Sequence, residues 1–338
     1  MSGYRLASSV PLDEGQVDRL RAIDPQVEIR SGWAMDPDEF RALIDTRTDI
    51  VYSFRLPEDL IELAPDLQWI QLLSAGSEHL EGNPVQQTRT RVTTVSGVHA
   101  TPIAEYVLAT ILALYRQLPR AYQAQMRREW IDQNEFTRTS RELRGRTIGI
   151  LGYGAIGREI ARLAQPFGVT IYAMKRDPSV RAASGYTVPG TGDPEGRLPD
   201  EYFGHDGLHD LLARSDVVVV ALPSTRDTRG LLDAAAFDAM KSGSYLINIA
   251  RGDILDESAL IAALKAKTLA GAALDVFEEE PLPKESELWG LDNVIATPHI
   301  SGASRPYLRR CFEVLVENFR RFAEGKPLLN QVDPERGY

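Results

Sequence analysis

Short apolar runs alternate with amphipathic segments along the first part of the chain. Between residues 4 and 96, runs rich in β-branched and aromatic residues are separated by segments in which apolar residues recur every three or four positions. This alternation predicts a small α/β domain with a parallel sheet. The expected strands and helices fall, in order, at residues 5–10, 14–23, 27–29, 37–43, 50–54, 57–63 and 69–73.

A long helical segment is expected at residues 101–127, with Thr101 as its N-cap and Pro102 as its first residue. Residues 106–115 are almost continuously apolar, but the run is far shorter than the roughly 20 residues of a membrane span. It therefore predicts a buried helix. One small domain rarely covers so apolar a helix, so we expect a homodimer that shares it. Burial within a single chain is the alternative.

A second alternation begins at residue 147. Its expected strands lie at residues 147–151, 170–174, 217–222, 245–249, 271–276 and 294–296. Six parallel strands with crossover helices predict a doubly wound sheet of the Rossmann type. Residues 177–207 are rich in glycine and proline, and we interpret them as an extended loop. Such a long loop is usually functional or mobile, but we favour a tolerated surface insertion.

An amphipathic helix is expected at residues 306–322. Its apolar stripe consists of Leu308, Cys311, Phe312, Leu315, Val316 and Phe319. Such a helix can return to the first domain. The predicted fold class is therefore α/β: a dinucleotide-binding Rossmann domain at residues 99–304, and a smaller flavodoxin-like substrate domain, discontinuous in sequence, at residues 1–98 and 305–338. We expect the active site in the cleft between the two.

The motif GYGAIG at residues 152–157 joins the strand at 147–151 to an amphipathic helix that is expected to reach residue 167. Gly152 permits a tight turn, Gly154 lets the backbone approach a diphosphate, and Gly157 lets the helix pack closely on the strand. The motif alone is weak evidence. In the order strand, turn, helix, it predicts a dinucleotide site.

The strand at residues 170–174 ends in Lys175, Arg176 and Asp177, where NAD-binding proteins usually place an acid for the ribose hydroxyls. Two basic side chains can instead neutralise a 2′-phosphate, which favours NADP(H) over NAD(H). Asp177 would take the ribose role if it turned inward. A solvated strand end without a ligand is the remaining alternative.

Composition narrows the class of protein. The chain has 338 residues, 43% of them hydrophobic and 25% charged, as in ordinary globular proteins of about two domains. A formal net charge of −10 disfavours nonspecific binding to nucleic acid or acidic membranes. The N-terminus lacks an apolar core of signal-peptide length, and the single cysteine, Cys311, excludes an intrachain disulfide. We therefore expect a cytoplasmic protein.

Three polar motifs follow later strands: NIARGD at 248–253, EEEPL at 278–282 and TPHISG at 297–302. Taken singly, each has an ordinary structural explanation. Together with SAGSEHL at 74–80, SGVHATPIAE at 96–105 and the glycine motif, they resemble the D-isomer-specific 2-hydroxyacid dehydrogenase family. The resemblance spans nearly the whole chain, in the correct order.

The resemblance implies a catalytic triad. In it, Arg251 binds the substrate carboxylate and carbonyl oxygen, Glu280 orients the histidine, and His299 donates and accepts the proton. Backbone groups of Ser74, Ala75 and Gly76 are expected to hold the substrate carboxylate. The expected cofactor-binding set is Gly152, Tyr153, Gly154, Ala155, Ile156, Gly157, Lys175, Arg176, Leu222, Pro223, Thr228, Ile249, Ala250, Arg251, Asp275, His299 and Gly302.

The implied activity is reversible reduction of a small 2-oxoacid, such as glyoxylate, hydroxypyruvate or a branched 2-oxoacid, to the D-2-hydroxy acid with NAD(P)H. A dinucleotide-sensing binding or corepressor module, or a dehydrogenase of another small acid, is the alternative on the same fold. The other histidines, His79, His99, His205 and His209, have no spacing typical of a metal site, and this chemistry needs no metal.

Overall fold

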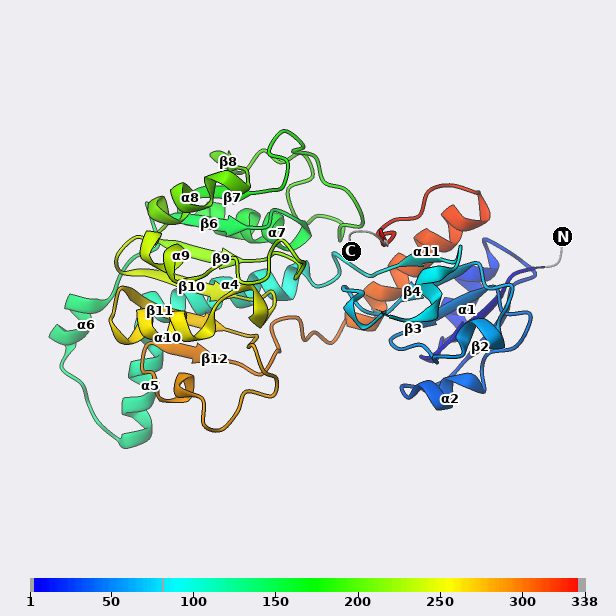
Figure 1. The fold of residues 1–338 in the computed structure, drawn as a ribbon, viewed down its shortest axis with the longest axis horizontal. Coiled ribbons are helices and arrows are strands. Elements are labelled where there is room, and N and C mark those ends of the chain that lie inside the picture. The colour runs from blue at the N-terminus through cyan, green and yellow to red at the C-terminus, as the bar shows by residue number, and fades with distance from the viewer. Residues whose placement is uncertain (1–2, 81, 334–338) are drawn as a thin grey trace. The chain divides into compact units, whose positions relative to one another are not determined.

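Residues 3–80 and 82–333 are described by a computed structural model, in which the chain divides into two units (Figure 1). The first unit combines the residues up to Val98 with Gly185–Val188 and the residues from Ser304 onward. The second unit consists of His99–Ser184 and Pro189–Ala303. A four-residue piece of the long loop after residue 177 thus belongs to the first unit.

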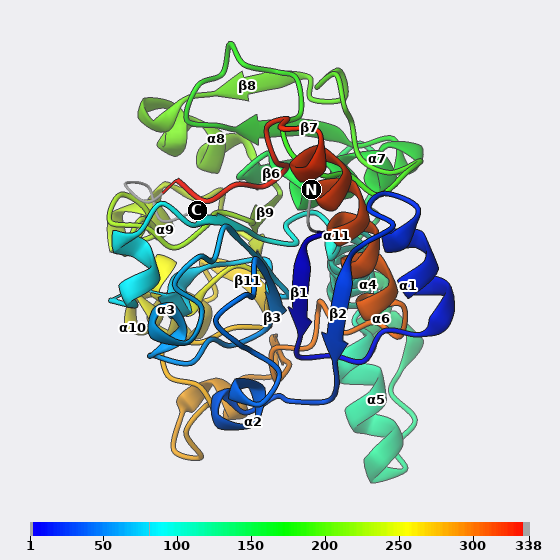
Figure 2. The same ribbon diagram turned by 90° about the vertical axis from the view of Figure 1, so that its right-hand side faces the viewer.

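The first unit is built on a five-stranded parallel sheet in the order β2-β1-β3-β4-β5, of which Figure 2 labels β2, β1 and β3. This is the flavodoxin-like order. Its strands are β1 (Arg5–Ser8), β2 (Glu28–Ser31), β3 (Ile50–Ser53), β4 (Trp69–Leu72) and β5 (Arg91–Thr93). Its helices are α1 (Glu14–Arg21), α2 (Pro37–Arg41), α3 (Leu60–Leu63) and α11 (Tyr307–Ala323), with short 3₁₀ turns at Glu78–Leu80 and Pro84–Gln87.

Helix α11 closes the first unit from the far end of the sequence. Its stripe, which includes Phe312, Leu315 and Phe319, is buried in one core with strands β1, β3 and β4, because the repeat of three and four places these side chains on one face. Beside it, α11 lies along α1 (Figure 2), where Arg19 pairs with Glu313 at 2.7 Å. The expected helix at 306–322 is confirmed to within one residue.

The second unit contains a seven-stranded parallel sheet in the order β12-β11-β10-β9-β6-β7-β8 (Figure 1). The strands are β6 (Thr147–Leu151), β7 (Thr170–Met174), β8 (Glu201–Phe203), β9 (Val217–Val220), β10 (Ser244–Asn248), β11 (Leu269–Leu274) and β12 (Val294–Ala296). The α-helices are α4 (Ala100–Tyr115), α5 (Leu118–Arg127), α6 (Gln133–Thr139), α7 (Ala155–Ala164), α8 (Leu208–Arg214), α9 (Ala234–Ala239) and α10 (Glu257–Lys265). The 3₁₀ turns are Gln165–Phe167, His205–Gly207, Gly252–Ile254 and Glu287–Gly290.

Each face of this sheet has its own apolar core. Helices α8, α9 and α10 pack on one face, and α4 and α7 pack on the other. The doubly wound architecture and the α/β fold class are therefore confirmed. Among the described residues, no helix combines the length and the apolar character that crossing a lipid bilayer requires.

Several expectations about local structure were wrong. Helix α4 begins at Ala100 with His99 as N-cap, so Thr101 lies inside the helix and does not cap it. The helix expected at 101–127 breaks at Gln117, whose φ of 57° is incompatible with a continuous α-helix. The interval 177–207 contains strand β8 and a 3₁₀ turn, because three of its residues pair with β7. Strand β5 and helix α6 were not expected from the pattern.

The apolar run of α4 is covered within its own unit. Val107, Ile111 and Leu114 pack in one core with Ile160 and Ala164 of α7. Burial inside one chain therefore accounts for the composition of α4. The apolar composition of α4 therefore no longer argues for a dimer.

Candidate active site

One row of register partners marks the carboxyl end of the sheet in the second unit. The row is made of Met174, Leu151, Val220, Asn248, Leu274 and Ala296. The residues that directly follow it are Lys175, Gly152, Ala221, Ile249, Asp275 and Thr297. Five of the six strands therefore deliver a residue of the predicted motifs to the same edge. In open α/β sheets this is the edge where ligands bind.

The glycine turn connects β6 to α7. Gly152 has a φ of 102°, and a Cβ there would lie 2.5 Å from the carbonyl oxygen of Ala221. A Cβ on Gly157 would lie 2.4 Å from the carbonyl oxygen of Gly152. By contrast, no atom of the described chain lies within 4 Å of the Cβ position of Gly154. Two glycines thus serve packing, whereas the third leaves its surface open to a ligand.

Helix α7 begins directly after this turn. In its first backbone hydrogen bond, the amide of Arg158 donates to the carbonyl of Gly154. The amides of Ala155, Ile156 and Gly157 therefore belong to the opening turn, where N–H groups point along the helix axis and favour an anion.

The basic end of β7 lies beside the turn. The ammonium group of Lys175 donates to the carbonyl of Val180, and the lysine pKa is lowered by burial and by the charge of Arg158. Arg176 is exposed. Asp177 accepts from the backbone amide of Ser179 at 2.9 Å and from its hydroxyl at 2.6 Å, bonds that hold its pKa below the usual range. Its carboxylate is thus occupied in capping a local turn.

The loops after β9 and β10 are shaped by short polar contacts. Thr228 donates to the carbonyl of Pro223 at 2.6 Å in the first loop, which begins at the half-buried Leu222. In the second loop, the buried Asn248 accepts from the amide of Ala250 at 3.1 Å and donates to the carbonyl of Arg251 at 3.0 Å. This turn buries Ile249 and leaves Arg251 half-buried after the strand, with its guanidinium donating to the carbonyl of Ala250 at 2.7 Å.

The structure brings Glu280 and His299 together, although 19 residues separate them. The Nδ1 atom of His299 lies 2.9 Å from Oε2 of Glu280. The other carboxylate oxygen, Oε1, accepts from the amide of Phe277 at 3.1 Å, so the acid is held from both sides. The side chains of His299 and Glu280 are 52% and 37% exposed. The second ring nitrogen of His299 is therefore positioned to serve a ligand.

A buried carboxylate holds the turn that carries His299. Asp275 is 0% exposed, and its Oδ1 accepts from the hydroxyl of Thr297 at 2.6 Å and from the amide of Ile300 at 2.8 Å. Its Oδ2 accepts from the amide of Ser301 at 2.8 Å, and its carbonyl accepts from the amide of His299 at 2.9 Å. At the end of the same turn, the carbonyl of Gly302 lies 3.1 Å from Nδ1 of His99.

Sequence reasoning missed Tyr106 in this arrangement, and it gave no role to Thr297, although Thr297 belongs to the motif TPHISG. Thr297 bridges Asp275 to the phenol of Tyr106, whose oxygen lies 2.7 Å from the threonine hydroxyl. Tyr106 sits in the apolar run of α4, and burial raises its pKa to about 12. A polar aromatic in an otherwise apolar helix was the available signal, since a buried phenol usually has a hydrogen-bond partner.

The residues expected to hold the substrate carboxylate lie in the first unit. The loop after β4 is closed by a bond from the hydroxyl of Ser74 to the carbonyl of Gly76 at 2.7 Å, and Ala75 is exposed. The hydroxyl of Tyr307, from α11, donates to the carbonyl of Leu73 just before the loop. The loop is thus held by a bond within itself and, at its start, by a bond from Tyr307 in the C-terminal segment of the first unit.

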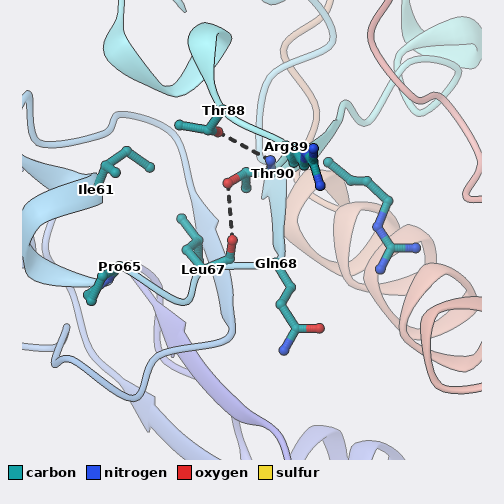
Figure 3. Close-up of a pocket in the computed structure, with 8 residues that line it drawn as sticks. Ile61, Pro65, Leu67, Gln68, Thr88, Arg89 and Thr90 are labelled. Atoms are coloured by element: carbon teal, nitrogen blue, oxygen red, sulfur yellow. Dashed lines mark hydrogen bonds between the residues drawn. The ribbon is translucent and has the colours of Figure 1, made fainter.

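A surface hollow in the first unit is unrelated to the motifs. It is lined by Ile61, Pro65, Leu67, Gln68, Thr88, Arg89, Thr90 and Arg91 (Figure 3). The hydroxyl of Thr90 donates to the carbonyl of Leu67, and the amide of Thr90 donates to Thr88. These polar groups therefore serve the local backbone. None of the predicted site residues lines the hollow.

The family model "D-isomer specific 2-hydroxyacid dehydrogenase, NAD binding domain" matches residues 108–301, more than half of the chain. The chain belongs to this family. The match covers the glycine turn, Arg251, Glu280 and His299, and it assigns the second unit's sheet to an NAD-binding domain.

Related proteins are similar to this chain beyond residues 108–301 as well. D-3-phosphoglycerate dehydrogenase of Archaeoglobus fulgidus is 31% identical over 96% of this chain, which spans 58% of that relative's length. (S)-sulfolactate dehydrogenase of Chromohalobacter salexigens is 36% identical over 79% of this chain and 81% of its own length. A D-isomer specific 2-hydroxyacid dehydrogenase from Xanthobacter autotrophicus Py2, solved with NADPH and MES, is 32% identical with a TM-score of 0.77, and the match covers 100% of both chains.

The open surface at Gly154 and the crowding at Gly157 predict different effects of the same substitution. Gly157→Ala should lower the free energy of unfolding by about 1–3 kcal/mol, because the new methyl group meets backbone. Gly154→Ala should leave stability unchanged and weaken dinucleotide binding at least about tenfold, because its methyl group stands where the diphosphate approaches. Urea unfolding and fluorescence titration with NADPH measure the two effects. Equal losses of stability would contradict the assignment of separate roles.

Proposed function

We propose that this protein reduces a small 2-oxoacid to the D-2-hydroxy acid with a nicotinamide dinucleotide, and catalyses the reverse oxidation. The observation that carries the proposal is the contact between His299 and Glu280 at 2.9 Å, at the sheet edge that also carries Arg251 and the glycine turn. Carbonyl reduction needs a proton donor for the oxygen and a hydride for the carbon. When bound, the reduced nicotinamide supplies the hydride.

His299 is the proposed general acid. Its Nδ1–H faces the carboxylate of Glu280, so the proton on Nε2 is the one given to the carbonyl oxygen. The carboxylate holds the orientation of the ring. In the oxidation direction, neutral Nε2 removes the hydroxyl proton.

Arg251 is the proposed substrate ligand. Its planar guanidinium matches a carboxylate with two parallel hydrogen bonds, and its charge stabilises the oxygen as negative charge develops. In the first unit, the backbone of Ser74 to Gly76 is the proposed second ligand for the carboxylate. The first unit, residues 1–98 and 305–338 in our assignment, then acts as the substrate domain, and residues 99–304 act as the dinucleotide domain.

NADP(H) is the proposed cofactor. Lys175 and Arg176 follow β7 beside the glycine turn, where the adenosine ribose of a dinucleotide is expected. The carboxylate of Asp177 is engaged by Ser179, which disfavours the alternative in which it binds the ribose hydroxyls. The related Xanthobacter structure contains NADPH, which is consistent with this choice.

A cytoplasmic location is part of the proposal. It is supported by Cys311, the single cysteine of the sequence, which can form no intrachain disulfide and lies buried in the core of the first unit. Such a thiol packs as a small apolar side chain.

The activity can be tested with a panel of small 2-oxoacids, including glyoxylate and hydroxypyruvate, with NADPH or NADH. We expect at least one oxoacid to support oxidation of NADPH, and His299→Ala to lower kcat by roughly 10²–10⁴ because the general acid is lost. Absorbance at the reduced nicotinamide band follows the reaction. Dinucleotide binding without turnover of any oxoacid would support a sensing module instead. Unchanged turnover in His299→Ala would remove this residue from the mechanism.

Cofactor choice can be tested by replacing Lys175 and Arg176 with neutral residues. Hydrogen bonds to a charged group contribute about 1.5–3 kcal/mol each, so we expect binding of NADPH to weaken at least tenfold, with little change for NADH. Titration with each dinucleotide measures both constants. Arg229, an exposed arginine paired with Asp253 in the same unit, offers a matched control as Arg229→Gln. Equal losses for the two dinucleotides would contradict a 2′-phosphate contact.

We also propose a homodimer, formed through α5 and not through α4. Leu118, Tyr122 and Met126 form a stripe along α5 and are 54–69% exposed, and Trp130 beyond it is 98% exposed. Helix α5 projects from the second unit (Figure 1). A two-fold axis brings the same stripe together from both copies, burying an area on the order of 1,000 Å².

Sedimentation at micromolar concentration tests the dimer. We expect the wild type to sediment as a dimer and Tyr122→Ser combined with Trp130→Ser to shift it to monomers, because the apolar area is lost. Trp289→Ser removes another aromatic side chain, 58% exposed elsewhere in the second unit, and should leave the dimer intact. A monomeric wild type would exclude this proposal.

A further inference from the structure

The second residue of the glycine turn is bound to a distant carboxylate. The hydroxyl of Tyr153 donates to Oδ2 of Asp193 at 2.8 Å, and both side chains are buried. Asp193 also accepts from the amide of Arg197 at 3.0 Å and from the amide of Leu198 at 2.9 Å. The contact therefore joins the turn between β6 and α7 to the segment that follows β7.

A second set of contacts holds the same segment to α7. The buried guanidinium of Arg158 donates to the carbonyls of Asp193 and Arg181 and lies 4.9 Å above the ring of Tyr153. Directly before Asp193, the amide of Gly192 donates to the fully buried carboxylate of Glu159 at 2.6 Å. This part of the chain is thus built against the first turn of α7, and the interpretation of residues 177–207 as a surface insertion was incomplete.

The charge of Asp193 is maintained although the group is buried. Burial raises the pKa of this carboxyl, but the donors from Leu198, Arg197 and Tyr153 outweigh it, so its pKa lies below the ordinary value. Burial and the contact with Asp193 raise the pKa of Tyr153, which keeps the phenol protonated and donating. A hydrogen bond from a neutral donor to an ionised acceptor is among the stronger ones in a protein.

The turn needs such an anchor because of its sequence. Tyr153 stands between Gly152 and Gly154, residues without side chains and with wide backbone freedom. The amides of Gly152 and Tyr153 donate to the carbonyl of Met174, and the side chain of Tyr153 is the one side chain through which this three-residue stretch can be held further. Holding it in place lowers the conformational entropy that a diphosphate would otherwise have to remove on binding.

We propose that Asp193 is a positioning residue for the cofactor: through Tyr153 it holds the glycine turn in the shape that binds the dinucleotide diphosphate. The proposal rests on the function proposed above, since it requires a dinucleotide at this turn. Asp193 contacts neither substrate nor cofactor in this role. Its effect should appear in cofactor affinity and in KM for the cofactor, whereas a merely structural anchor would affect only stability.

The test compares Tyr153→Phe, Asp193→Asn and the double variant. We expect each single variant to raise the Kd for NADPH about fivefold to tenfold, and the double variant to be no weaker than the single ones, because the residues act as one unit. At saturating NADPH, kcat of Asp193→Asn should stay within about twofold of the wild type, since the triad is untouched. Fluorescence titration and steady-state kinetics give these values.

Tyr202→Phe is the matched control. Tyr202 lies in the same segment, its ring packs edge-on against Tyr153 with centroids 5.7 Å apart, and its hydroxyl donates to the carbonyl of Gly196 at 3.0 Å. The substitution removes a hydroxyl from the segment without touching the link to the turn. We expect it to leave the Kd unchanged.

Four results would overturn the proposal: an unchanged Kd in Tyr153→Phe, additive losses in the double variant, an equal loss in Tyr202→Phe, or a wild type that binds no dinucleotide. The last result would remove the proposed function as well, whereas the first three leave it standing. Should Asp193→Asn fail to fold, Tyr153→Phe decides the matter, because it keeps the buried ring and removes only the donor.

Discussion

The buried carboxylate of Asp275 is the constraint on which the proposed catalytic edge depends. A carboxyl group buried at the end of an inner strand is tolerated only when donors surround it, because an unsatisfied buried polar group is destabilising. Here the donors come from Thr297, Ile300 and Ser301, all in the turn that carries His299. Satisfying Asp275 therefore sets the path of that turn. The position of His299 therefore follows from the hydrogen bonds that Asp275 accepts from this turn.

The parallel register of the sheet completes the arrangement. Because β6, β7, β9, β10, β11 and β12 end level with one another, residues more than 100 positions apart in sequence leave the sheet at one edge. Glu280 reaches this edge from the loop after β11, and His299 reaches it after β12. The loops contribute the chemistry, and the strands supply the rigid frame that a site for hydride and proton transfer requires.

The part of the site that is proposed to bind the diphosphate depends on holding the glycine turn in one conformation. Glycines let a ligand approach the backbone of the turn at residues 152–157, but they also make the turn flexible. The contact of Tyr153 with Asp193 and the packing of Gly157 against the carbonyl of Gly152 offset that flexibility. The segment after β7, which adds the edge strand β8, supplies the anchor from outside the sheet. Stability of this segment and affinity for the cofactor are thus linked in our proposal.

The sequence by itself determined the elements whose signals are local. Apolar runs located most strands of both sheets, the spacing of Phe312, Leu315 and Phe319 located α11, and the order strand, glycine turn, helix located the dinucleotide motif. Only the tertiary structure decided the rest. The pairing of β8 and the cap at His99 depend on segments distant in sequence, whereas the break at Gln117 has a local signal, Pro119, that the expectation of a continuous helix overlooked. The partnership of Tyr153 with Asp193 spans 40 residues, and the burial of α4 by α7 left α5 as the exposed apolar helix. Periodicity reports which face of an element is apolar, whereas only folding determines what covers it.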